Sequence, residues 1–174
     1  MAYKLLYVGR LVPFKHVEDI FKAARLLKKD YALTIIGDGP LMEDLRAKAP
    51  KNTKFLGNIS NKEVIKQMKN HDMLLLPSDT EPFGRVILEA MQQGLPIIST
   101  NCGGPKDIIT NGRNGYLVKV GDFKDIADKI HLIMKSKSNI KKNNLLDIKR
   151  YYWKNILPKY ESLYKRVVKE WQTK

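Results

Sequence analysis

The sequence is poor in cysteine, in histidine and in long apolar runs, and each shortage excludes a class of protein. A single cysteine, Cys102, cannot build an internal disulfide framework, and it is expected to be a small buried residue after a strand. Three scattered histidines offer no cluster at metal-ligand spacing. The longest apolar runs, such as residues 73–76, are too short to span a membrane, and the N-terminal MAYKLLYVGR lacks the apolar segment of a signal peptide. These shortages predict a cytoplasmic protein.

What the chain does have is enough material for a core. Its 174 residues are 43% hydrophobic and 29% charged, which is typical of one globular domain. The net charge of +14 is uneven, because residues 1–134 carry net +5 and residues 135–174 carry net +9. A basic tail suits a solvated helix face, an anionic membrane surface or a nucleic acid. No RNA-binding signature or zinc-finger spacing accompanies it, so nucleic acid is not expected as a partner.

Short apolar runs alternate along the chain with segments of helical period. Strands that are apolar throughout, separated by helices, are typical of a parallel sheet covered on both faces. The pattern therefore predicts an α/β domain, a doubly wound, Rossmann-like parallel sheet of about six strands. The expected strands are 4–8, 32–36, 54–56, 73–76, 96–99 and 116–118. The expected helices are 17–29, 41–48, 61–70, 83–93, 105–109 and 123–134.

In such sheets ligands bind at the carboxyl ends of the strands, so the loops that follow strands are the candidate sites. The first loop, GRLVPFK, combines Gly9 with two cations, Arg10 and Lys15, that could hold a diphosphate. The second, GDGP, is better explained as a tight strand-to-helix turn. The fifth, NCGGPKDII, contains a glycine pair that would let backbone approach a ligand closely, and the alternative is a bare turn.

The fourth loop, LPSDTEPFGRVILEA, places two acids around the start of a helix. If the helix begins near Phe83 or Gly84, its free N–H groups favour a negative group. Glu81 then lies just ahead of the helix, and Glu89 lies about 7.5 Å along its axis. A ligand with phosphates in the middle and hydroxyl-bearing rings on either side would suit this arrangement. The alternatives are a capping role for Glu81 and a surface position for Glu89.

Together these loops resemble a known family. The motifs GRLVPFK, GDGP, FLGNIS, LPSDTEPFGRVILEAMQQGLPIIST, CGGPKDII and NGRNGYLV, in this order and spacing, resemble the C-terminal domain of glycosyltransferase family 4. That family comprises retaining enzymes of GT-B architecture that use nucleotide sugars. The resemblance implies transfer of a sugar from a nucleotide-diphosphate sugar to a glycan or lipid-linked acceptor, in cell-surface polysaccharide or glycolipid synthesis.

The resemblance also implies roles for individual residues. Arg10 and Lys15 match the positions that bind the donor diphosphate, Glu81 matches the acid that faces the donor sugar, and these three are the candidate catalytic residues. Glu89 matches the acid that accepts hydrogen bonds from the ribose, and Ile59 falls near the base-binding edge. The remaining implied donor-binding residues are Gly9, Phe83, Gly84, Arg85 and Val86.

Two departures from the family pattern concern loop geometry. His16 stands where a glycine is common after the lysine, and Asp107 stands where a longer acid is frequent after the glycine pair. The sequence contains no Asp-x-Asp that could hold a divalent metal over the diphosphate. We therefore expect no metal requirement and no cofactor besides the donor substrate.

The domain organisation follows from the same resemblance. Residues 1–150 are expected to form the donor-binding domain, and residues 151–174, which include YYWKNILPKYESLYKRV, resemble the family's last helix, which packs towards the other domain. The chain starts almost directly with the first strand of the second lobe. We therefore expect a donor-binding half that is inactive without an N-terminal lobe.

Two alternatives stay open at this point. Another GT-B enzyme acting on nucleotide sugars, such as an epimerase, would share the sheet and a diphosphate site. A non-catalytic interaction module would use the basic tail instead. An anionic membrane surface remains a candidate partner in either case, with a location at the inner face of the membrane.

Overall fold

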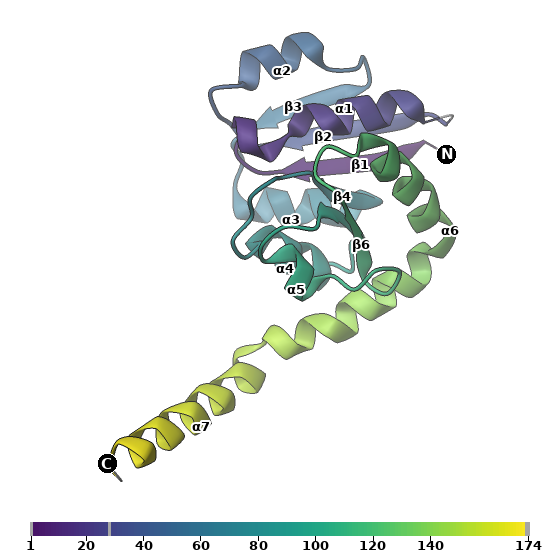
Figure 1. Ribbon diagram of the computed structural model, residues 1–174. Coiled ribbons are helices and arrows are strands. Elements are labelled where there is room, and N and C mark those ends of the chain that lie inside the picture. Colours follow the sequence, from purple (N-terminus) through teal and green to yellow (C-terminus); the bar gives the residue numbers. More distant parts are fainter. Residues whose placement is uncertain (1, 28, 173–174) are drawn as a thin grey trace.

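The computed structural model describes residues 2–27 and 29–172, and a sheet of six parallel strands lies at its centre (Figure 1). The strand order is β3-β2-β1-β4-β5-β6. All five neighbouring pairs are parallel, which confirms the expected doubly wound fold. The strands are β1 (Tyr3–Val8), β2 (Tyr31–Ile36), β3 (Thr53–Gly57), β4 (Met73–Leu76), β5 (Ile97–Thr100) and β6 (Gly115–Val118).

Helices connect the strands and cover both faces of the sheet. The α-helices are α1 (Val17–Leu26), α2 (Met42–Lys48), α3 (Asn61–Asn70), α4 (Arg85–Gln92), α5 (Pro105–Ile108), α6 (Phe123–Asp147) and α7 (Trp153–Gln172). Two 3₁₀ turns are η1 (Pro13–Lys15) and η2 (Ile148–Tyr151). Because crossovers between parallel strands are right-handed, α1 and α2 lie on one face and α3 and α4 on the other. The contacts agree, since α1 packs on α2 and α6, and α3 packs on α4.

The strands form here because their side chains can be buried on both faces at once. β4 is buried along its whole length, and Leu5, Leu6 and Tyr7 of β1 have no exposed surface. Such strands carry no polar face, which is the pattern that predicted the parallel sheet. The central position of β1 and β4 sets the location of the site. The order of strands reverses between them, and the crevice at their carboxyl ends is where ligands bind in this architecture.

The expected helices and strands are confirmed in kind and mostly within two residues. The helix expected over 17–29 ends at Leu26, and Lys28 lies outside the described residues. The helix expected over 123–134 is wrong at its end, because α6 continues to Asp147. Its polar run contains a buried stripe that continues from Ile133 through Ile140 to Asn144. These residues keep one side of the helix against the domain, although the sequence around them is rich in Lys, Ser and Asn.

The last helix, α7, differs from every other long element. None of its residues is buried, and it projects away from the sheet at the C-terminal end of the chain (Figure 1). Its exposed side chains include Trp153, Leu157, Tyr160, Tyr164 and Trp171. These follow one another at intervals of three, four or seven residues, so they form one apolar face. Within the described part of the chain, no helix combines the length and the apolar character needed to cross a membrane.

Candidate functional site

The first loop of the site, after β1, carries the two predicted cations. Gly9 lies at the end of β1, where a side chain would meet the Tyr7 hydroxyl at 2.8 Å. Arg10 is exposed, and its guanidinium makes no hydrogen bond or ion pair with any described residue, whereas Lys15 is partly buried at the end of η1. Residue 16, which links η1 to α1, takes a left-handed backbone conformation. Both cations therefore project from the carboxyl edge of β1, as the sequence predicted.

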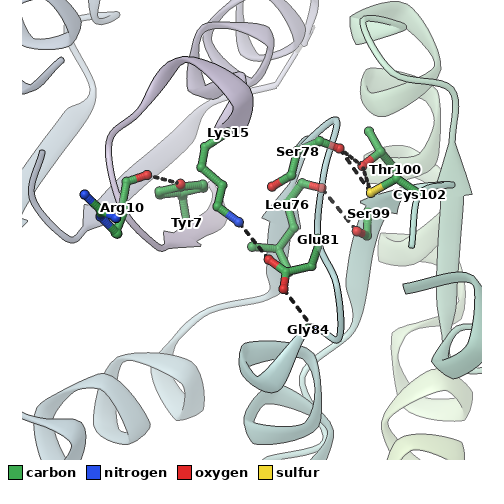
Figure 2. A network of polar contacts seen from close by, with 10 residues as sticks. All are labelled: Tyr7, Arg10, Lys15, Leu76, Ser78, Glu81, Gly84, Ser99, Thr100 and Cys102. Atoms are coloured by element: carbon green, nitrogen blue, oxygen red, sulfur yellow. Dashed lines mark hydrogen bonds and ion pairs between the residues drawn. The ribbon is translucent and has the colours of Figure 1, made fainter. Parts of the chain in front are cut away.

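Tyr7 of β1 holds this loop through its side chain, a role that was not predicted from the sequence. Its hydroxyl donates a 2.9 Å hydrogen bond to the carbonyl of Arg10 (Figure 2). Burial, and next the negative charge of Glu81, raise the pKa of Tyr7 far above its usual range, so the hydroxyl keeps its proton. The tyrosine looked like one more core residue of β1. A buried hydroxyl that must find an acceptor is the signal that could have identified it.

The central contact of the site joins the first loop to the fourth. The Lys15 ammonium donates a 2.7 Å hydrogen bond to Glu81 Oε2 (Figure 2). The exposed fraction of the side chain is 16% for Lys15 and 21% for Glu81. The other carboxylate oxygen, Oε1, accepts the N–H of Gly84 at 2.9 Å. Gly84 is the residue from which α4 begins, with φ of 84°. Glu81 therefore caps the start of α4 and pairs with Lys15 at the same time.

Glu81 is ionised in this setting. Partial burial pushes the pKa of Glu81 upward, but the ion pair with Lys15 and the N–H of Gly84 outweigh it and leave the pKa below its ordinary value. The free N–H groups at the start of α4 are thus already served in part by a carboxylate of the chain itself. An anionic ligand at this place would share Lys15 and the helix terminus with Glu81.

The helix α4 carries the remaining predicted residues of the fourth loop. Phe83 and Arg85 are exposed, and Val86 is partly buried against the core. Glu89, at the fifth position of α4, is partly buried. Across residues 2–27 and 29–172 its carboxylate has no hydrogen bond or ion pair, so it is available to a ligand.

A cavity of about 330 Å³ lies beside the first loop and brings three predicted residues together. Gly9, Arg10 and Ile59 all line it, although Ile59 follows β3 in the sequence. The loop after β2 supplies another wall, and there Gly37 approaches Gly9 so closely that a Cβ would lie 1.9 Å from the carbonyl oxygen. Sequence reasoning did not assign a site role to the polar residues of the lining, which are Asp38, Asn58 and Asn61.

The glycine pair of the fifth loop approaches the chain itself. A Cβ on Gly104 would lie 2.4 Å from the backbone of Phe83, and one on Gly103 would lie 2.3 Å from the carbonyl oxygen of Glu81. The N–H of Gly104 also donates to that carbonyl at 2.8 Å. The glycines thus hold the fourth loop in place from behind, which is a different use from the close approach to a ligand expected of them.

Neighbouring polar groups complete the floor of the site. Cys102 is half-buried rather than buried, and its thiol lies 3.3 Å from the carbonyl of Ser78, which also accepts the hydroxyl of Thr100 (Figure 2). These contacts tie the loop after β5 to the loop after β4. Nowhere in the described residues do three or more His, Cys, Asp or Glu side chains gather in a way that could hold a metal ion.

Comparison with known proteins identifies the family. The family model for glycosyl transferases group 1 matches residues 1–150. The chain is 33% identical over 139 residues to the glycogen synthase of Mycobacterium tuberculosis, which covers 75% of this chain and 34% of that protein. It is 30% identical over 179 residues to the N-acetyl-alpha-D-glucosaminyl L-malate synthase of Bacillus anthracis, covering 95% of this chain and 46% of that protein. The chain therefore spans less than half the length of these relatives.

Solved structures show the same arrangement of strands and helices. The lipopolysaccharide outer core galactosyltransferase WaaB is 30% identical and superposes with a TM-score of 0.82, covering 93% of this chain and 50% of that one. The Anabaena protein HepE, solved in complex with UDP-glucose, is 22% identical and has a TM-score of 0.79, with 97% and 49% covered. At this lower identity the second likeness concerns the fold alone.

Proposed function

The chain belongs to the glycosyl transferases group 1 family, and we propose that it is the donor-binding half of a retaining enzyme. In this proposal it is the C-terminal lobe of a glycosyltransferase family 4 member. The parent enzyme transfers a sugar from a nucleotide-diphosphate sugar to a glycan or lipid-linked acceptor. The observation that carries the proposal is the Lys15–Glu81 pair, which joins the loops after β1 and β4 at the reversal of strand order.

The diphosphate is assigned to the edge between these two loops. The Arg10 guanidinium has no hydrogen bond or ion pair with the described residues there, and Lys15 is held in place by Glu81. When the sugar–diphosphate bond breaks, negative charge builds on the departing phosphate, so cations that are already in position stabilise the transition state more than the ground state. By analogy with other enzymes, loss of one such group lowers kcat by about 10²–10³. The protein cations would do the work of a metal ion, and we expect no metal requirement.

The two ends of the donor are assigned to either side of the diphosphate. Glu89 is partly buried, and its carboxylate has no polar partner in the described part of the chain, which suits the ribose hydroxyls. The cavity lined by Gly9, Arg10 and Ile59 suits the nucleobase. Glu81 faces the sugar, where its ionised carboxylate would orient hydroxyls and offset the positive charge that develops on the ring. The backbone at Phe83 and Gly84, the exposed Arg85 and the partly buried Val86 at the start of α4 complete the donor site.

We assign α7 to the contact with a second lobe. Its apolar face, which includes Leu157, Tyr160 and Tyr164, is exposed in this chain, and a contiguous exposed apolar face commonly marks an interaction site. The structural relatives are about twice as long as this chain. The N-terminal lobe of the same parent protein is therefore the proposed partner, with residues 1–150 as the donor-binding domain and the segment after them as the bridge. The isolated chain would bind the donor without transferring its sugar.

The positive charge of the C-terminal segment fits work beside anionic lipid. Residues 135–174 carry net +9, and such a segment is attracted to the cytoplasmic leaflet. We propose a cytoplasmic location, peripheral at the inner face of the membrane, and an acceptor in cell-surface polysaccharide or glycolipid synthesis. Two other functions compete with this proposal: a different GT-B enzyme acting on nucleotide sugars, and a basic interaction module.

Calorimetry on the 174-residue chain tests the donor site. UDP, GDP and ADP are titrated into the wild type, into Arg10→Ala and into Lys15→Ala. The control is Lys66→Ala, which removes an exposed lysine of α3. We expect one nucleotide to bind, the two site variants to lose about tenfold or more in affinity, and the control to match the wild type. If no nucleotide binds at millimolar concentration while anionic vesicles or DNA do, the interaction module is favoured. Undiminished affinity in both site variants would remove the phosphate assignments.

A further inference from the structure

His16 has a backbone conformation that its residue type does not favour. Its φ of 48° and ψ of 39° lie in the left-handed region, and it is the one residue other than glycine with positive φ among residues 2–27 and 29–172. A Cβ makes this conformation costly, and glycine would adopt it without strain. Residues in such strained conformations are concentrated at functional sites, where contacts of the side chain hold them in place.

The imidazole of His16 lies between two carboxylates. Nε2 is 3.2 Å from Asp79 Oδ2 in the loop after β4, and Nδ1 is 4.0 Å from Asp19 Oδ2 on α1. Asp19 is nearly buried and is already paired with Lys22 at 2.9 Å. Asp79 is exposed, and no other cation among the described residues forms an ion pair with it. The contact with Asp79 is therefore the one that depends on His16.

This contact is one of three that join the same two loops at consecutive residues. The N–H of Asp79 donates a 3.0 Å hydrogen bond to the carbonyl of Phe14, Lys15 pairs with Glu81, and His16 contacts the Asp79 side chain. The first two links place Lys15 and Glu81 against each other. The third is the only one of these three whose strength changes with the charge of a titrating imidazole.

The charges around His16 define what its protonation does. Lys15 and Glu81 balance each other on one side, and Lys22 and Asp19 balance each other on α1. Asp79 is left with a negative charge beside the place assigned to the diphosphate. The hydrogen bond from His16, followed by that from Thr80, lowers the pKa of Asp79, so it stays ionised. An imidazolium at position 16 neutralises this charge, whereas a neutral imidazole leaves it to repel an anion.

We propose that His16 is a positioning residue that ties the loop of Lys15 to the loop of Glu81, and that its protonation tightens the binding of a nucleoside diphosphate. The proposal rests on the donor site described under the proposed function. The sign follows from the pairing: the tie is stronger when the imidazole is charged than when it is neutral, so it weakens as the pH rises. Histidine changes charge between about pH 5 and pH 8, which sets the range for the test.

The experiment compares nucleotide affinity at pH 6 and pH 8. UDP, GDP and ADP are first titrated into the wild type, and the tightest of them is then titrated into His16→Gly. Glycine removes the side chain and suits the left-handed backbone, so this variant should melt within a few degrees of the wild type. We expect it to bind about threefold more weakly at pH 6, the size of one exposed ion pair, and less than twofold more weakly at pH 8. Because the nucleotide phosphate also titrates, the ratio of variant to wild type is compared at each pH.

Two controls separate the tie from other effects. His131→Asn removes a histidine of α6 that contacts Tyr3 of β1, and it should leave the pH dependence unchanged. In an Asp79→Asn background, His16→Gly should cost less affinity than in the wild type, because the partner of the tie is already gone. Equal affinity of His16→Gly and wild type at pH 6, or an equal ratio at both pH values, overturns the inference alone. If the wild type binds none of the three nucleotides, the proposed function fails and the inference falls with it.

Discussion

Lys15 Nζ and Glu81 Oε2 lie 2.7 Å apart although the two residues are 66 positions apart in the chain, and their contact joins the loops that follow β1 and β4. Those strands are neighbours at the centre of the sheet. The pair therefore links the two sides of the crevice in which this architecture binds its ligands. A phosphate group that approaches Lys15 does not meet a free cation. The phosphate meets a cation that the Glu81 carboxylate has already oriented, and it would have to share this cation with the carboxylate.

Acid titration should reveal the contribution of Glu81 to stability. The pKa of Glu81 is lowered in the folded chain, so its contribution is fully present above the ordinary glutamate pKa of about 4.3 and is lost as the pH falls through the lowered value. We expect Glu81→Gln to be about 1 kcal/mol less stable than the wild type at pH 7, allowing for solvent screening. The difference should shrink in urea unfolding at pH 3.5. Glu161→Gln, at an exposed position on α7, is the control, and a difference that does not change with pH would contradict the prediction.

Glu89 should be needed for the ribose and not for the phosphates. We expect Glu89→Ala to weaken nucleoside diphosphate binding by about tenfold, because hydrogen bonds to a charged acceptor are among the stronger ones. Removing a negative charge near an anionic ligand would otherwise strengthen binding, so a loss is informative. Calorimetry with UDP and with 2′-deoxy-UDP should show a preference for the ribonucleotide in the wild type and little preference in the variant. Glu43→Ala, which is highly exposed on α2, is the control. A preference that survives in Glu89→Ala would reassign the ribose.

Gly104 should tolerate no side chain, although its backbone conformation is ordinary. A Cβ there would lie 2.4 Å from the backbone of Phe83, so Gly104→Ala should push the fourth loop forward. We expect a loss of about 1–3 kcal/mol in the free energy of unfolding, together with weaker nucleotide binding. Gly121→Ala is the comparison, because a Cβ there meets nothing within 4 Å and the cost is that of its positive φ alone. Equal stability of both variants, with unchanged binding, would contradict the prediction, because the fourth loop would then shift at little energetic cost.

The sequence predicts the sheet well because its central strands, such as β4 and β5, are buried on both faces and appear in the sequence as apolar runs. It also locates Arg10, Lys15 and Glu89 correctly at the ends of strands or on the following helix. It cannot reveal that Lys15 pairs with Glu81, because that contact depends on which strands are neighbours. Nor does it indicate the role of Tyr7, whose hydroxyl is hidden in a core strand.

The C-terminal half of α6 was missed for a different reason. There the helix is held by a narrow stripe in which Ile140 and Asn144 are fully buried, while the other Lys, Ser and Asn residues around them are exposed or only partly buried. The hydropathy averaged over such a segment is polar, so the few apolar residues of the stripe are not detected. Secondary-structure periods are visible only when several apolar positions repeat, and this stripe has few.

The last helix should be dispensable for the stability of the domain. No residue of α7 is buried, and its contacts are mainly with the short turn η2. A chain that stops after Tyr152 should therefore unfold within about 4 °C of the full chain, which corresponds to about 1 kcal/mol for a domain of this size. It should also bind less of a hydrophobic dye, because the face that includes Leu157 and Tyr164 is gone.

A chain that stops after Ser138 is the matched control for this truncation. It also loses Ile140 and Ile148, which are buried against the domain, so its free energy of unfolding should fall by several kcal/mol. Scanning calorimetry of the three chains checks both expectations. A large loss of stability on removing α7 alone would mean that its face packs on the donor domain in solution. In that case α7 would be part of the donor domain's own core, and the proposed contact with a second lobe would have to be made by another surface.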